Sequence, residues 1–123
     1  MNPPSDLQRA AETALADIVA GTGKRGLLTY EHEGNSRWKV MVSFGTAETG
    51  VFVDAGADWP DLLAQFADGI QEAYIDDYWE TWPPCPGHRH PLRPGVDGRT
   101  AVWACPASEW QVPIGELAAM RRD

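Results

Sequence analysis

The chain has 123 residues, of which 43% are hydrophobic and 23% are charged, proportions close to those of ordinary globular domains. This length suits one domain with its own core, and the composition excludes a disordered tail, a collagen-like repeat and a coiled coil. The 10 basic and 18 acidic residues give a formal net charge of -8 at pH 7, which disfavours nucleic acid and anionic membranes as partners.

The amino-terminal residues indicate no export. Residues 1–6 contain neither a basic nor an apolar segment, so we predict no signal peptide. The longest uncharged apolar run is far shorter than the ~20 residues that cross a bilayer. We therefore expect a cytoplasmic protein, in which two cysteines are more often thiols or metal ligands than a disulfide. The scarcity of lysine beside plentiful Ala, Gly, Asp and Arg is typical of high-GC bacterial genomes.

The first half of the chain predicts a helix followed by three strands. Apolar residues recur at helical spacing over about 6–20, until Gly21-Thr22-Gly23 ends the pattern. Strand-like segments follow at 26–33 and 36–44, and Gly34-Asn35 between them favours a two-residue hairpin turn. A third strand is predicted at 50–54. One face of these strands alternates toward burial, with Trp38, Val40, Val42, Phe44, Val51 and Val53.

A second helix is predicted over about 60–79. It carries one apolar stripe and an opposite acidic stripe that includes Asp68, Glu72 and Asp76. No Lys or Arg occurs between Lys39 and Arg89. The acidic stripe has two interpretations, a solvated helix face or a docking surface for a basic protein partner.

The last part predicts a hairpin and a short helix. Residues 91–96 and 99–105 are strand-like on either side of Asp97-Gly98, a pair typical of type I′ hairpin turns. Two prolines in the first of these strands predict that it lies at a sheet edge. Residues 114–120 are predicted as a terminal helix.

Two cysteines and two histidines make the candidate metal site. Cys85, His88, His90 and Cys105 supply the ligand types of a structural Cys₂His₂ zinc site. With Asp97 and Gly98 as the turn residues, His90 would lie opposite Cys105, with Cβ atoms about 5 Å apart. His88 would lie on the same side of that strand, and Pro86-Gly87 would turn Cys85 back toward it.

Other interpretations of these four residues stay open. A Cys85–Cys105 disulfide fits the same register, and two unrelated thiols beside exposed histidines are also compatible with the sequence. Four protein ligands leave no position for a reactive water, so the closed site is structural. A site that lacked one histidine would be open, and Glu80 or Glu109 would then be the candidate base of a small metal-dependent hydrolase.

Tryptophans concentrate around this segment. Trp79, Trp82, Trp103 and Trp110 either cover a small site and exclude water, or present an aromatic platform to a partner. The candidate partner-binding residues are therefore Trp79, Trp82 and Trp110 with the three acidic residues of the second helix. His32, alone in its strand, is predicted to lie at the surface.

Two resemblances accompany these patterns. Cys85-Pro86-Gly87-His88 and Cys105-Pro106-Ala107-Ser108 each follow a tryptophan, and residues 82–106 resemble a degenerate zinc ribbon or zinc knuckle, in which paired two-ligand turns hold one ion. Ser108 departs from that pattern, so His90 would supply the fourth ligand. The segment is also similar to small uncharacterised actinobacterial proteins, and the element order resembles that of type III secretion chaperones.

Together these features predict an α+β fold of order α-β-β-β-α-β-β-α. We expect a single domain over 1–123, with a helix, meander and helix core at 6–80 and a metal-binding hairpin with a terminal helix at 81–123. The predicted function is a non-enzymatic, zinc-stabilised protein-interaction module of the adaptor, chaperone-like or antagonist kind, and the alternative is the hydrolase.

Overall fold

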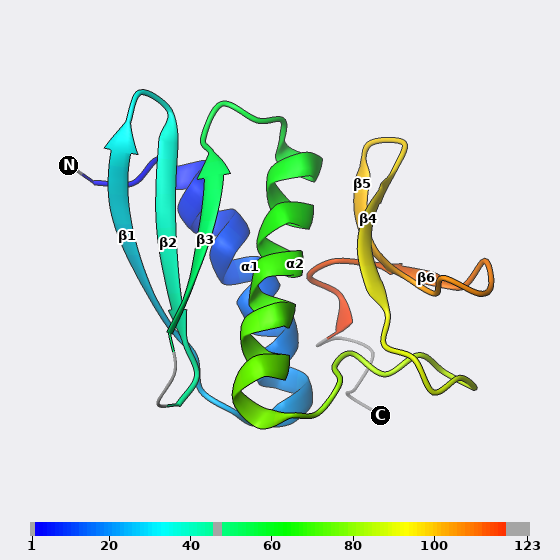
Figure 1. The fold of residues 1–123 in the computed structure, drawn as a ribbon. Coiled ribbons are helices and arrows are strands. Elements are labelled where there is room, and N and C mark those ends of the chain that lie inside the picture. The colour runs from blue at the N-terminus through cyan, green and yellow to red at the C-terminus, as the bar shows by residue number, and fades with distance from the viewer. Residues whose placement is uncertain (1, 46–47, 118–123) are drawn as a thin grey trace.

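The computed structural model describes residues 2–45 and 48–117, which form two helices and two antiparallel three-stranded sheets (Figure 1). This confirms the predicted α+β class. In chain order the elements are α1 (Ser5–Thr22), β1 (Leu27–Gly34), β2 (Arg37–Ser43), β3 (Glu48–Asp54), α2 (Trp59–Tyr78), β4 (Arg93–Asp97), β5 (Thr100–Ala104) and β6 (Gln111–Pro113).

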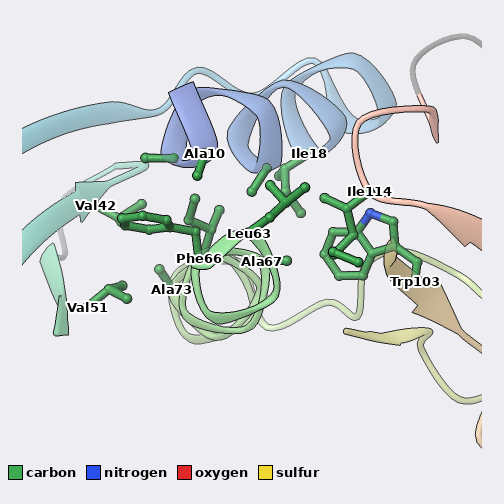
Figure 2. Packing of buried hydrophobic residues seen from close by; sticks show 14 of the residues in the cluster. Ala10, Ile18, Val42, Val51, Leu63, Phe66, Ala67, Ala73, Trp103 and Ile114 are labelled. Carbon is green, nitrogen blue, oxygen red and sulfur yellow. The ribbon is translucent and has the colours of Figure 1, made fainter. Parts of the chain in front are cut away.

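Helix α2 lies between the two sheets and packs beside α1 (Figure 2). Its apolar stripe is buried as predicted, and Phe66 and Ile70 are fully inaccessible to solvent. The facing side of α1 is rich in alanine, and such small side chains let two helices approach closely. One hydrophobic cluster runs from the first sheet through both helices to Trp103 and Ile114 in the carboxyl-terminal part.

The first sheet has the order β1-β2-β3 and buries the face that alternation predicts. Trp38, Val40 and Val42 are at most 2% exposed, whereas Phe52 on the other face is 49% exposed. Helix α2 approaches β3 so closely at Gly69 that a Cβ there would lie 2.5 Å from Val51 Cγ2. His32 is exposed, as predicted.

The turn of the first hairpin differs from the prediction by one residue. It consists of Asn35 and Ser36, and Gly34 ends β1 opposite Arg37. This shift of the turn alone would move the pairing register by two residues, but a bulge between His32 and Gly34 takes back one of them. His32 therefore lies opposite Trp38 and not opposite Arg37, and Leu28 and Tyr30 of β1 lie on the side of the sheet that packs against the core.

The turn of the second hairpin was also predicted wrongly. Its central residues are Gly98 and Arg99, so Val96 lies opposite Ala101 and not opposite Arg99. Gly98 has a φ of 62°, whereas Asp97 keeps the extended conformation of a strand residue and pairs with Thr100. A glycine-first turn avoids the cost of left-handed backbone at Asp97. The register moves by two residues, which leaves every side chain on its predicted face.

The last strand was not predicted from the sequence. β6 pairs with β5, so the second sheet has the order β4-β5-β6 and β4 lies at an edge, as its prolines predict. Ile114 and Gly115 form a turn after β6. Residues 118–120 of the predicted terminal helix lie outside the described residues.

Candidate metal centre

Three of the four candidate ligands lie in one loop between α2 and β4. Main-chain hydrogen bonds close this loop: Leu92 N–H donates to Pro83 O at 2.8 Å, and Cys85 N–H donates to His90 O at 3.3 Å. Inside it, His88 N–H donates to Cys85 O at 3.1 Å, which makes a tight turn, and Gly87 within that turn has a φ of 79°. This turn brings the Cys85 thiol and the His88 ring together.

Cys105 reaches the same place from the end of β5. Its N–H donates to Trp110 O at 2.9 Å, and its Sγ accepts the N–H of Ala107 at 3.4 Å. These bonds form a second turn of the Cys-Pro-x-x type, which faces the first. Both cysteines are buried, whereas His88 is exposed and His90 is half-buried.

The four side chains have the spacing of a tetrahedral ligand set. His88 Nδ1 lies 3.2 Å from Cys85 Sγ and 3.5 Å from Cys105 Sγ, and His90 Nε2 lies 3.3 Å from Cys105 Sγ. All four donor atoms are within 4.8 Å of one another. With Zn–S of about 2.3 Å and Zn–N of about 2.0–2.1 Å, a tetrahedron has S···N edges of roughly 3.5 Å. The arrangement therefore suits one tetrahedral ion.

The structure brings all four predicted metal ligands together, but not through the predicted strand pairing. β4 begins at Arg93, so His90 lies in the loop before the strand and has no cross-strand partner. The hydrogen bonds of the loop, and not the hairpin register, carry His90 to Cys105. Both thiols are free, so the structure contains no Cys85–Cys105 disulfide.

The two thiols differ in acidity. Burial, together with the neighbouring Cys105, raises the pKa of Cys85 to about 11. Burial also opposes ionisation of Cys105, but hydrogen bonds with Ser108, His90, Cys85 and the Ala107 N–H outweigh it and lower the pKa of Cys105 to about 5. A coordinated dication favours the thiolate form of both side chains.

Two buried polar residues that bond to the carboxyl-terminal part of the chain were not predicted from the sequence, and one of them, Gln71, holds the ligand loop. Gln71 of α2 is 1% exposed, and its Nε2 donates to Trp82 O at 3.0 Å and to Leu92 O at 2.7 Å. Asp17 of α1 is fully buried and accepts hydrogen bonds from Trp103 and Gly115. A polar residue within an apolar helical stripe could have indicated both of them. Gln71 lies between Ala67 and Tyr74 in the stripe of α2, and Asp17 lies between Ala14 and Ile18 in that of α1.

Replacing Gln71 with leucine is expected to weaken both the fold and the site. The change leaves two buried carbonyl groups without the amide, at a cost of roughly 2–3 kcal/mol of unfolding free energy. It also frees both ends of the loop that carries three ligands, so we expect metal affinity to fall about 10-fold or more. Chemical denaturation and competition with a chromogenic chelator measure the two effects. Gln65→Leu, on the exposed side of the same helix, should change neither by much.

The predicted partner-binding residues separate into exposed and buried ones. Asp68, Glu72 and Asp76 are exposed on α2, and Trp79 is 92% exposed at its end. Trp110 is half-buried and packs against the hydrophobic cluster. Trp82, in contrast, is 9% exposed, and its ring packs on the backbone of Gly21 with no room for a Cβ. Its side chain is therefore part of the core and not of an exposed platform.

Comparison with protein-family models, curated proteins and solved structures finds no match to this chain. The resemblances to zinc ribbons, to actinobacterial proteins and to type III secretion chaperones therefore rest only on the residues and the element order described above.

No helix within residues 2–45 and 48–117 is long and apolar enough to cross a membrane.

Proposed function

We propose that this chain is a non-enzymatic protein-interaction module stabilised by a structural zinc ion. The observation that carries the proposal is the convergence of two thiols and two imidazoles within 4.8 Å, at the S···N spacing of a tetrahedral site. Thiolate and imidazole ligands in tetrahedral geometry suit Zn²⁺ better than the hard, oxygen-seeking cations. A reducing cytoplasm, in which thiols persist, is the compartment that the proposal assumes.

Zinc in this position would act as a cross-link. Cys85, His88 and His90 belong to the loop after α2, and Cys105 follows β5, so one ion would join two segments of a small domain. Four protein ligands leave no coordination position for a water or a substrate. Glu80, one candidate base of the hydrolase alternative, accepts a hydrogen bond from the Tyr74 hydroxyl at 2.6 Å. The geometry therefore supports a structural site better than the hydrolase.

The interaction half of the proposal is supported by the carboxyl-terminal end of α2. Trp79 is almost fully exposed, and with Ile75, Asp76, Glu80 and Thr81 it lines a hollow of about 200 Å³. A large exposed aromatic ring beside carboxylates suits a basic partner, because a cation can contact both the ring face and the negative charges. An adaptor, chaperone-like or antagonist role would use this surface.

Trp79 occupies a position where stability favours glycine. Its φ is 55°, in the left-handed region that ends many helices and that bulky residues rarely adopt. Trp79→Gly is therefore expected to raise the free energy of unfolding by about 1 kcal/mol, measured by urea denaturation. Trp79→Ala is the control, because it removes the ring but keeps the strained backbone and should give no gain. A loss of stability in Trp79→Gly would show that the ring supports the fold.

Metal analysis combined with thiol titration tests the proposed function. The purified chain should contain one tightly held zinc per molecule, with both thiols protected until a chelator removes the ion. An exchangeable ion with a bound water would favour the hydrolase, and a metal-free, reactive thiol pair would contradict both. For the interaction half, a partner captured from the host by the zinc-loaded protein should be lost from Trp79→Gly, although that variant is more stable.

A further inference from the structure

The outer edge of β3 is open to pairing. β3 is the last strand of its sheet, with β2 on one side only. Ala55 N–H donates to Ser36 O at 2.7 Å and continues the β2–β3 ladder by one pair. Because hydrogen-bonded pairs alternate in an antiparallel ladder, Val53 and Val51 also direct their main-chain groups toward β2. The N–H and C=O groups of Phe52 and Gly50 therefore point away from β2, toward the open edge.

A groove runs beside this edge. It has a volume of about 240 Å³ and is bounded by β3 around Gly50 and Phe52 and by the exposed side of α2 at Asp68 and Glu72. Figure 2 shows Val51 of β3 next to α2, and Gly69 allows the close approach described above. An extended chain pairing with β3 would therefore have the helix along one of its sides.

The two sides of this edge differ in chemistry. On the helix side the groove is lined by the carboxylates of Asp68 and Glu72. Neither carboxylate takes part in the ion pairs within the described part of the chain, which are Arg9–Asp6 and Lys39–Glu31. On the other side the Phe52 ring is half-exposed, and two basic groups lie over it, Arg37 Cζ at 5.1 Å and Lys39 Nζ at 5.8 Å from its centroid. Side chains of an added strand alternate between these two sides. Lysine or arginine would therefore face the carboxylates, and apolar residues would face Phe52.

We propose that the open edge of β3 and the acidic side of α2 bind an extended, basic segment of a partner protein by strand addition. The inference rests on the proposed interaction function and names the chemistry of its partner. Main-chain hydrogen bonds to Gly50 and Phe52 would supply affinity, and the two carboxylates would select positive charge. A second copy of this chain is a poorer occupant, because pairing of two β3 edges would bring two acidic helices together.

A titration of the zinc-loaded full chain tests the proposal. The probe is a fluorescein-labelled heptapeptide, Lys-Val-Lys-Val-Lys-Thr-Lys. Fluorescence anisotropy measures its binding in low and in high salt. The control peptide has Glu in place of each Lys. The lysine peptide should bind and the glutamate peptide should not. Asp68→Asn with Glu72→Gln should weaken binding about 10-fold or more, and salt should weaken it in the unmodified chain. The control is Glu109→Gln with Glu116→Gln, which makes an equal charge change at exposed sites away from the groove. It should change the affinity for the lysine peptide by less than about 2-fold.

Strand addition itself is tested at the edge. Gly50→Pro removes an outward-pointing donor without touching the β2–β3 hydrogen bonds, and we expect it to weaken peptide binding about 10-fold. The same peptide should slow hydrogen exchange of the Gly50 and Phe52 amides. The acidic double variant, which leaves the backbone unchanged, keeps the test decisive if Gly50→Pro folds poorly.

Several outcomes would overturn this inference. These are absence of binding at millimolar peptide, equal weakening in the control double variant, or binding without protection of the two amides. A dimer that Gly50→Pro converts to a monomer would assign the edge to a second copy instead. Loss of zinc, by contrast, would contradict only the structural-zinc part of the proposed function. If a captured host partner still binds to Gly50→Pro and to the acidic double variant, the groove is not its binding site. The proposed interaction function would then be unaffected.

Discussion

Cys105→Ser is expected to abolish tight zinc binding and to lower the melting temperature by roughly 10–20 °C. The serine hydroxyl is a poor zinc ligand, and the remaining three side chains no longer close the tetrahedron that joins the loop to the end of β5. A ligand present at about 1,000 times its dissociation constant stabilises the folded state by roughly 4 kcal/mol. For a domain of this size each kcal/mol corresponds to roughly 3–5 °C. Differential scanning calorimetry with metal analysis measures both effects.

The chelator response distinguishes a lost metal from a lost thiol. Chelation should lower the melting temperature of the unmodified chain to about that of Cys105→Ser, and should leave the variant itself unchanged. Arg89→Ala is the matched control, since Arg89 is exposed in the same loop between the two histidines and is not a proposed ligand. A Cys105→Ser protein that kept both its zinc and its stability would remove Cys105 from the ligand set.

Asp17→Leu is expected to destabilise the fold by roughly 3–5 kcal/mol, a large fraction of the stability of a domain this small. Asp17 Oδ2 accepts the indole N–H of Trp103 at 2.9 Å and the main-chain N–H of Gly115 at 2.6 Å. Leucine would leave these two donors without their acceptor at the contact between α1 and the carboxyl-terminal sheet. Urea denaturation monitored by circular dichroism measures the loss.

A double-mutant cycle separates the hydrogen bond from general packing. Trp103→Phe removes the indole donor, so its cost and the cost of Asp17→Leu should be less than additive, with a coupling of about 1–3 kcal/mol. Glu12→Leu, an exposed acidic position on the same helix, should change stability by less than about 0.5 kcal/mol. Additive costs in the cycle would show that Asp17 acts through something other than Trp103.

Most secondary structure follows from local pattern. Helical periodicity placed both helices, and the alternation from Trp38 to Val42 identified the buried face of the first sheet. These predictions were correct because burial of one face is repeated along each element and does not depend on a single contact. β6 was missed because three residues, one of them a proline, show too little alternation to indicate a strand.

The hairpin turns show what local pattern leaves open. Gly34 and Gly98 marked both turns, yet each turn lies one residue later than predicted. A glycine near a turn satisfies several turn positions, so the glycine alone does not set the register. In the first hairpin the bulge sets the register that places Leu28 and Tyr30 against the core. In the second hairpin both registers keep every side chain on its face, and the observed turn has Gly98 instead of Asp97 in the left-handed conformation.

Residue type and short spacing were enough to predict the fold class, the buried faces, the acidity of α2 and the identity of the four candidate ligands. How those ligands meet depends on the folded chain. Their convergence depends on loop hydrogen bonds and on Gln71, which holds the loop ends at Trp82 and Leu92. Tertiary structure also decided that Trp82 belongs to the core and Trp79 to the surface. Contacts between residues far apart in the chain set these properties, and no local pattern records them.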